Sequence, residues 1–143
     1  SLVGSEMCIR DRIHTHREKA LAAAEQKAAN RLTEAERKAA VKRAAQMLAE
    51  KTAHFAKEMG VTYGRITIRE QKTRWGSCSS AGNLNYNWKL VLMPERVMDY
   101  VVIHELAHRK EMNHSARFYA VVAQQMPDYK VWQSWLKEHG REY

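Results

Sequence analysis

Apolar side chains recur at helical spacing between residues 34 and 59, which is the longest regular pattern in the chain. Thr33 to Glu36 has the form of a capping box, and Gly60 is a suitable helix stop. We therefore predict a helix from about Glu34 to Met59, preceded by another that ends near Arg31. The positions expected to pack on the core are Val41, Ala44, Ala45, Leu48, Phe55 and Met59.

After Gly60 the pattern changes to short alternating segments that are typical of strands. The first spans residues 65–70, and a turn at 80–83 leads to extended segments at 84–87 and 90–93. Pro94 is placed to open a helix that reaches about Lys110. Further helices are predicted over 116–126 and from Pro127 to Gly140, with Trp132 and Trp135 at packing positions. This order predicts an α+β fold in which N-terminal helices pack on a small, mostly antiparallel sheet.

The helix expected after Pro94 carries the sequence His104-Glu105-Leu106-Ala107-His108. Residues four apart on a helix are offset by about 40° and about 6 Å, so His104 and His108 present their rings to one point. Glu105 lies about 100° around and reaches a water held there. Two neutral nitrogen ligands beside a carboxylate are the groups that a zinc hydrolase requires.

His114 can join this pair only if the helix ends between Arg109 and Asn113. On an unbroken helix His114 would lie about 240° around from His108 and face away from the metal. We expect Asn113 to adopt a left-handed terminating conformation and Ser115 to cap the next helix. Glu111, the alternative third ligand, fails on reach, because three ligands spread over about 10 Å of helix axis cannot all contact one ion.

Four separated segments resemble the YgjP-like metallopeptidase family, relatives of the SprT-like and WLM zinc peptidases. They are residues 74–78, 84–88, 100–108, and 113–115 with Phe118. The resemblance spans about residues 61–140. It implies a zincin-like fold with one Zn²⁺ per chain, held by His104, His108 and His114, and with Glu105 as general base. Tyr119 departs from the Trp that the family often has at this position.

Several further residues are candidates for contact with a substrate or with the oxyanion that forms during hydrolysis: Arg74, Asn85, Tyr86 and Tyr119. In zincins a strand beside the cleft pairs with the extended peptide, and by resemblance residues 84–87 are the candidate strand. The polar side chains of this segment suit an ordinary edge strand equally well. Trp75 is expected to pack rather than to bind a ligand. Cys78 is either a fourth zinc ligand or, as we favour, a small buried side chain.

The net charge of +8 favours acidic partners, but residues 1–60 and 61–143 each contain 12 Lys or Arg and 8 Asp or Glu. The excess is spread along the chain, so any association with DNA is expected to be non-specific. Cys8 and Cys78 are too few for a disulfide framework, which favours a cytoplasmic setting. No apolar run approaches the length of a membrane span, so no membrane partner is expected.

At 143 residues the chain is sized for one domain. Residues 1–12 fit nothing that follows and resemble a translated adapter sequence. We therefore expect a single domain over 13–143, with a helical part at 13–60 and a catalytic core at 61–143.

The sequence predicts a zinc metallopeptidase that acts on peptides or proteins. The alternative is a non-catalytic, zinc-stabilised module associated with nucleic acid. Glu105 favours the enzyme, since a purely structural zinc site has no use for a base beside an open position.

Overall fold

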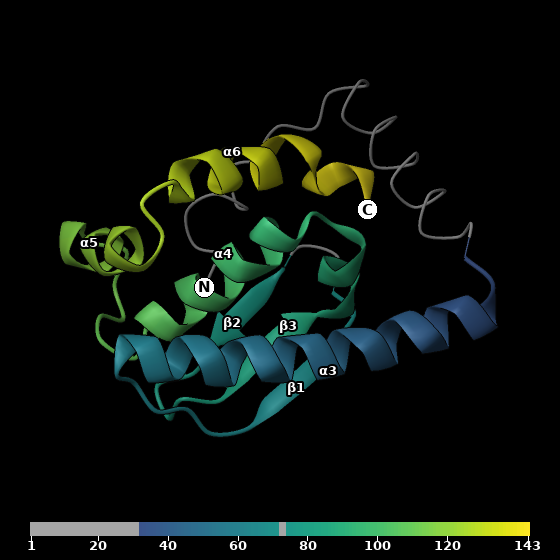
Figure 1. Cartoon of the computed structure of the whole chain (residues 1–143), viewed down its shortest axis with the longest axis horizontal. Helices are drawn as coiled ribbons and strands as arrows, with labels where there is room; N and C mark the ends of the chain where they lie inside the picture. Colours follow the sequence, from purple (N-terminus) through teal and green to yellow (C-terminus); the bar gives the residue numbers. More distant parts are fainter. Residues whose placement is uncertain (1–31, 72–73) are drawn as a thin grey trace.

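A computed structural model describes residues 32–71 and 74–143. The expected helix before Arg31 and the stretch 1–12 lie outside these residues. Labelled as in Figure 1, the elements are α3 (Glu34–Met59), β1 (Ile66–Arg69), β2 (Gly76–Cys78), β3 (Leu84–Asn87), the 3₁₀ helix η2 (Trp88–Leu92), α4 (Glu95–Ala107), α5 (Ala116–Gln125), α6 (Tyr129–His139) and η3 (Gly140–Glu142).

Helix α3 begins and ends where its local sequence predicts. The Thr33 hydroxyl accepts a hydrogen bond from the Glu36 amide, and the Glu36 carboxylate accepts one from the Thr33 backbone N–H. Gly60 closes the helix in a left-handed conformation with φ of 70°. The buried residues follow an almost unbroken four-residue spacing, which turns one face of the helix to the core: Ala40, Ala44, Leu48, Thr52, Ala56 and Met59.

The three strands form one mixed sheet in the order β1-β3-β2. A short turn with Gly82 at φ of 90° joins β2 to β3, so these two strands are antiparallel. Strand β1 pairs parallel to β3, with Ile66 opposite Leu84. The expectation of a mostly antiparallel sheet is therefore wrong for this pair. Strand β3 lies between β1 and β2, both of which precede it in the chain. Its hairpin with β2 sets its direction, and in that direction it runs parallel to β1.

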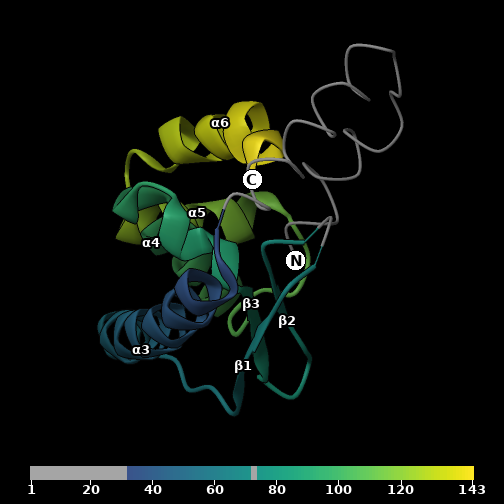
Figure 2. The ribbon, with the colours of Figure 1, turned by 90° about the vertical axis from the view of Figure 1, so that its right-hand side faces the viewer.

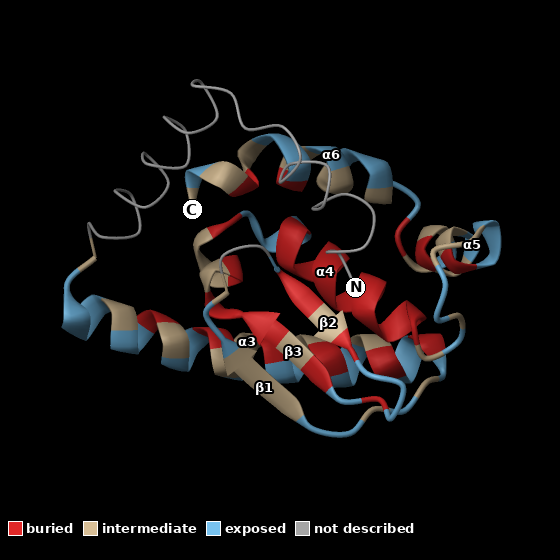
Figure 3. Cartoon of the chain, turned by 180° about the vertical axis from the view of Figure 1, so that it is seen from behind, coloured by how far each residue is buried: buried red, intermediate tan, exposed pale blue. Residues whose placement is uncertain are grey.

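The helices α3 and α4 cover one face of this sheet (Figures 1 and 2). On that face the Tyr86 hydroxyl bonds the Thr52 hydroxyl of α3, and Gly76 lies against Val101 of α4. Helix α6 lies on the side of α4 away from α3, and α5 lies near the C-terminal end of α4 (Figures 1 and 3). Helix α4 is consequently buried on every side, and all residues from Val97 to Ala107 are buried (Figure 3). The helix that carries His104, Glu105 and His108 is thus the central element of the core.

The segment 90–93 was expected to be extended, but residues 88–92 form the 3₁₀ helix η2 instead. The Asn87 side chain accepts a hydrogen bond from the Lys89 amide at 3.0 Å and caps the turn. Its amide group also donates to the carbonyls of Gln71 and Arg74, which anchors the end of β3. The apolar pattern of this segment suggests a strand, but the Asn87 cap stabilises a 3₁₀ helix there.

Candidate metal centre

The structure brings His104, His108 and His114 together, and one ring nitrogen from each lies within 4.8 Å of the others. His104 lies in the last turn of α4 and His108 is its C-cap. His114 comes from the loop before α5. His104 and His108 are buried, whereas His114 is partly exposed. The spacing argument from sequence therefore predicted a cluster that the tertiary structure contains.

The chain leaves α4 early enough to bring His114 back to the cluster. The amides of His108, Arg109 and Lys110 each bond the carbonyl three residues earlier, which tightens the end of the helix into a 3₁₀-type turn. The expected helix end before Asn113 is correct. The expected left-handed Asn113 is wrong, because no non-glycine residue in the described part of the chain has positive φ. The 3₁₀ turn makes such a residue unnecessary.

Arg109 and Ser115 fix the two ends of this loop. The Arg109 guanidinium donates to the carbonyls of Thr62 and Ser80 at 2.8 and 3.3 Å, which ties the end of α4 to two neighbouring loops. The Ser115 hydroxyl accepts a hydrogen bond from the Phe118 amide and caps α5, as the sequence predicts. Both anchors restrict where His108 and His114 can lie.

The spacing of the nitrogens fits a tetrahedral zinc ion. Zinc binds imidazole nitrogens at about 2.0–2.1 Å, so tetrahedral angles place two ligand nitrogens about 3.3–3.4 Å apart. The Nε2 atoms of His104 and His114 are 3.3 Å apart. A hydrogen bond between two imidazoles also gives this distance, but it does not account for the convergence of a third ring nitrogen. The donor set therefore fits zinc.

Two of the three rings make hydrogen bonds through Nδ1, the nitrogen that does not point into the cluster. His108 Nδ1 lies 3.2 Å from the Glu111 carbonyl, which can only accept, so Nδ1 carries the proton and donates. His104 Nδ1 lies 3.3 Å from the Tyr100 hydroxyl. The sequence interpretation assigned no role to Tyr100, although its position four residues before His104 on a helix is a signal that could have revealed it. Glu111 takes part through its backbone.

The environment of the histidine cluster favours a neutral ring at His108. Burial lowers the pKa of His108 to about 4, so the ring is uncharged near neutral pH and can offer a nitrogen lone pair to a metal. Phe118, which is fully buried, packs against all three histidines with ring centroids 4.9, 4.5 and 5.0 Å away, in chain order. An apolar wall on one side of the cluster excludes water there and holds the rings in place.

Glu105 is a residue of α4, and its fully buried side chain lies against strand β2 of the sheet. A Cβ on Gly76 of β2 would come within 3.1 Å of Glu105 Oε2 and of Val101 Cγ1, which is tighter than ordinary contact. Glycine therefore allows β2 to approach the carboxylate this closely. The sequence interpretation gave Gly76 no individual role, since such a contact joins residues far apart in the chain.

We expect Gly76→Ala to lower kcat about tenfold while leaving the zinc content unchanged. The added methyl group must displace the Glu105 side chain by a few tenths of an ångström, and such a misplacement is costly if Glu105 is the general base that the sequence predicts. Steady-state kinetics with metal analysis measures both quantities. Ser77→Ala on the same strand is the control, because Ser77 contacts Asn85 on the opposite face. Wild-type kcat in Gly76→Ala would show that this contact does not position the carboxylate.

The model of the YgjP-like metallopeptidase domain matches residues 5–139. The chain belongs to the YgjP-like metallopeptidase family. No curated protein sequence matches it significantly.

Two solved structures are similar to this family member. One is the crystal structure of the metallopeptidase zymogen abylysin of Pyrococcus abyssi, with 24% identity, a TM-score of 0.57, and coverage of 62% of this chain and 90% of that chain. The other is the metallopeptidase zymogen jannalysin of Methanocaldococcus jannaschii, with 19% identity, a TM-score of 0.51, and coverage of 59% and 90%. At these identities the similarity shows the fold, and it confirms the α+β, zincin-like class.

Of the four candidate contacts, Tyr119 packs beside the histidine cluster of this YgjP-like protein. Its ring centroid is 6.3 Å from that of His114, and it stacks on Tyr129 of α6 at 5.8 Å. Arg74 is exposed, and its backbone carbonyl accepts a hydrogen bond from the Asn87 side chain. The structure therefore places Tyr119 beside His114 and Arg74 at the surface.

The other two candidates are engaged elsewhere. Tyr86 is 1% exposed and its hydroxyl lies 3.1 Å from that of Thr52; burial raises its pKa strongly, so the phenol stays protonated inside the core. Asn85 accepts a hydrogen bond from Arg69 and donates one to Ser77 on the sheet face away from α3. The hydrogen bonds of these two side chains are therefore made to Thr52, Arg69 and Ser77 and not to the three histidines.

The strand expected to pair with substrate is also placed differently. Strand β3 lies at the centre of the sheet with β1 on one side and β2 on the other, so both of its edges are already paired. The proposal that residues 84–87 pair with a peptide is therefore wrong. Strand β2 is an edge strand of this sheet, and it is the strand that lies against Glu105.

The two remaining residues singled out from sequence are packing residues. Trp75 is 3% exposed and belongs to the core, as expected. Cys78 is buried and is not part of the histidine group; burial raises the pKa of its thiol, which disfavours the thiolate that binds zinc. The structure thus favours a small buried side chain at Cys78 over a fourth ligand.

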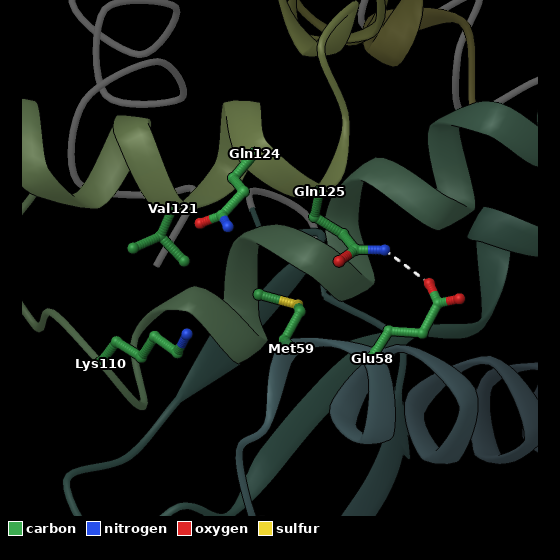
Figure 4. A pocket seen from close by; sticks show the side chains of 6 residues that line it. All are labelled: Glu58, Met59, Lys110, Val121, Gln124 and Gln125. Atoms are coloured by element: carbon green, nitrogen blue, oxygen red, sulfur yellow. Dashed lines mark hydrogen bonds between the residues drawn. The ribbon is translucent and has the colours of Figure 1, made fainter.

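A pocket of about 240 Å³ lies between the end of α3, the loop after α4, and α5 (Figure 4). The Gln125 amide donates to the Glu58 carboxylate at 2.6 Å across one side of it. The residues that line this pocket include none of the three histidines: Glu58, Met59, Lys110, Val121, Gln124 and Gln125. It is therefore a feature of the α3–α5 junction.

The helices in the described part of the chain lack the combined length and apolar character that crossing a membrane requires.

Proposed function

We propose that this protein is a zinc-dependent peptidase in which His104, His108 and His114 bind one Zn²⁺ and Glu105 is the general base. The observation that carries the proposal is the convergence of three ring nitrogens, two of them at the 3.3 Å separation of tetrahedral zinc ligands. Three protein ligands leave a fourth position open, which distinguishes a catalytic site from a closed structural one.

Bound zinc would lower the pKa of a water molecule from about 15.7 toward 7. Glu105 accepts a proton from the water that attacks the scissile carbonyl and returns it to the leaving amine. The carboxylate lies on the same helix as two ligands and is screened from bulk solvent by β2 and the core. A buried position strengthens its electrostatic interactions with the reacting groups.

We further propose that an extended peptide substrate pairs with the edge of β2, as in an endopeptidase. Backbone hydrogen bonds along an edge strand bind peptides of varied sequence. Strand β2 contacts Glu105 through Gly76, so a peptide on its edge runs past the catalytic carboxylate. The proposed substrates are peptides or proteins of the cytoplasm. We propose this compartment because two cysteines are too few for the disulfide framework of a secreted protein.

The alternative of a nucleic-acid module finds less support in the described surface. Several basic side chains are held in ion pairs: Arg37 with Glu70, Lys51 with Asp99, and Arg96 with Asp128. Paired cations contribute less to a surface that attracts phosphates. Non-specific DNA association remains compatible with a peptidase, and it is tested by adding DNA to the cleavage assay.

Removal of zinc should abolish cleavage of an unfolded protein substrate, and one equivalent of Zn²⁺ per chain should restore it. The test is a cleavage assay on purified protein before chelation, after chelation and after reconstitution, with and without DNA. Full turnover in metal-free protein would contradict a zinc peptidase. Zinc binding without hydrolysis of any peptide would favour the structural-zinc alternative.

A further inference from the structure

We propose that Tyr100 is a positioning residue for His104: its hydroxyl accepts a hydrogen bond from Nδ1–H and so directs Nε2 toward the metal. This inference rests on the proposed zinc site. Tyr100 and His104 lie one helical turn apart on α4, and both are fully buried. The hydroxyl oxygen is 3.3 Å from Nδ1, and the two rings meet edge to face with centroids 5.7 Å apart.

The proton on the far nitrogen decides which nitrogen of an imidazole can bind a metal. A neutral ring carries one proton, so a ring that binds zinc through Nε2 must carry it on Nδ1. An acceptor beside Nδ1 stabilises that tautomer, orients the ring and makes the ligand more basic. Tyr100 supplies such an acceptor from within the same helix, so its position relative to His104 is fixed by helix geometry.

The contact at His108 supports the same orientation. The Glu111 carbonyl takes the hydrogen bond of Nδ1, which leaves Nε2 of that ring for the metal. His104 Nε2 already lies 3.3 Å from His114 Nε2 inside the cluster. Both buried ligands are therefore held by their outer nitrogens, one by a backbone carbonyl and the other by a phenol.

A phenol differs from a carbonyl in being able to donate as well as accept. The Glu111 carbonyl can only accept, so it holds His108 in the tautomer protonated at Nδ1. The Tyr100 hydroxyl favours the same tautomer of His104 when it accepts from Nδ1–H. Removing the hydroxyl takes this acceptor away, so the tautomer that binds a metal through Nε2 loses its partner.

Tyr100→Phe should weaken zinc binding about 10- to 100-fold, the usual effect of losing an outer-shell partner of a ligand histidine. Competition with a zinc-binding dye measures the dissociation constant without relying on catalysis. Tyr86→Phe is the matched control, because it removes an equally buried hydroxyl that bonds Thr52 instead of a histidine. This control should lose comparable stability, measured by thermal melting of the metal-free proteins, and keep the wild-type zinc affinity.

Nitrogen NMR of the histidine side chains gives a second readout that does not require the Phe variant to fold. In zinc-loaded wild-type protein, Nδ1 of His104 should carry the proton. A proton on Nε2 would overturn the proposal, as would equal zinc affinity in wild type and Tyr100→Phe. Failure of the wild-type protein to bind zinc would instead overturn the proposed function, so the two failures are distinguishable.

Discussion

Glu105→Gln should lower turnover about 10²-fold or more while leaving the fold and the zinc content unchanged. Glutamine has the shape of glutamate, so it fits the space between α4 and Gly76 of β2. It cannot accept the proton of the attacking water, because the amide is not a base at neutral pH. Loss of turnover without loss of zinc would therefore separate catalysis from metal binding.

The measurement is kcat for cleavage of an unfolded protein, combined with metal analysis and thermal melting. Glu95→Gln is the control, since Glu95 stands at the other end of α4 with its side chain largely exposed and paired with Lys51. This control should keep the wild-type turnover. Unchanged turnover in Glu105→Gln would exclude Glu105 as the general base and would require another proton acceptor near the histidines.

His114→Ala should lose stoichiometric zinc while the metal-free protein keeps its fold. Only two protein ligands remain in this variant. Loss of a residue that merely orients a ligand can lower zinc affinity about 100-fold, and loss of a ligand itself should lower it further. His114 is partly exposed in a loop, so its truncation leaves no large cavity in the core. The equivalent variants of His104 and His108 remove buried rings and should also reduce stability.

Elemental analysis after dialysis gives the zinc content, and thermal melting of the chelated proteins gives the stability. His54→Ala on α3 is the control, because His54 is an exposed histidine that pairs with Glu58. It should bind one zinc, as the wild type does. Full zinc occupancy in His114→Ala would refute the three-histidine site and would reopen Glu111 or Cys78 as the third ligand.

The cluster itself was predictable because most of its geometry is local. His104, Glu105 and His108 lie within five residues, and the regular rise and rotation of a helix fix their relative directions. The need for a helix end before His114 followed from the same geometry. The residue chosen for that end was wrong, since the backbone uses a 3₁₀ turn through Lys110 and not a left-handed Asn113. Local geometry determined where the helix must end, but several backbone conformations satisfy that requirement.

The sheet was less predictable because strand order depends on pairings between distant segments. Alternation indicated strands at 65–70 and 84–87, but it carries no information on which strand takes the centre. The order β1-β3-β2 encloses β3, turns Tyr86 into the core against Thr52 of α3, and leaves β2 at the edge beside Glu105. This arrangement alone overturns residues 84–87 as the strand that pairs with substrate.

The sequence by itself determined the residues of the histidine cluster and the ends of α3, because spacing along a helix, a capping box and a terminal glycine act over a few residues. Only the tertiary structure decided what surrounds that cluster. The contact of Gly76 with Glu105 and the packing of Phe118 on three rings join elements whose positions are set by the whole core. Such contacts depend on how the layers pack, and no periodicity within one segment records them.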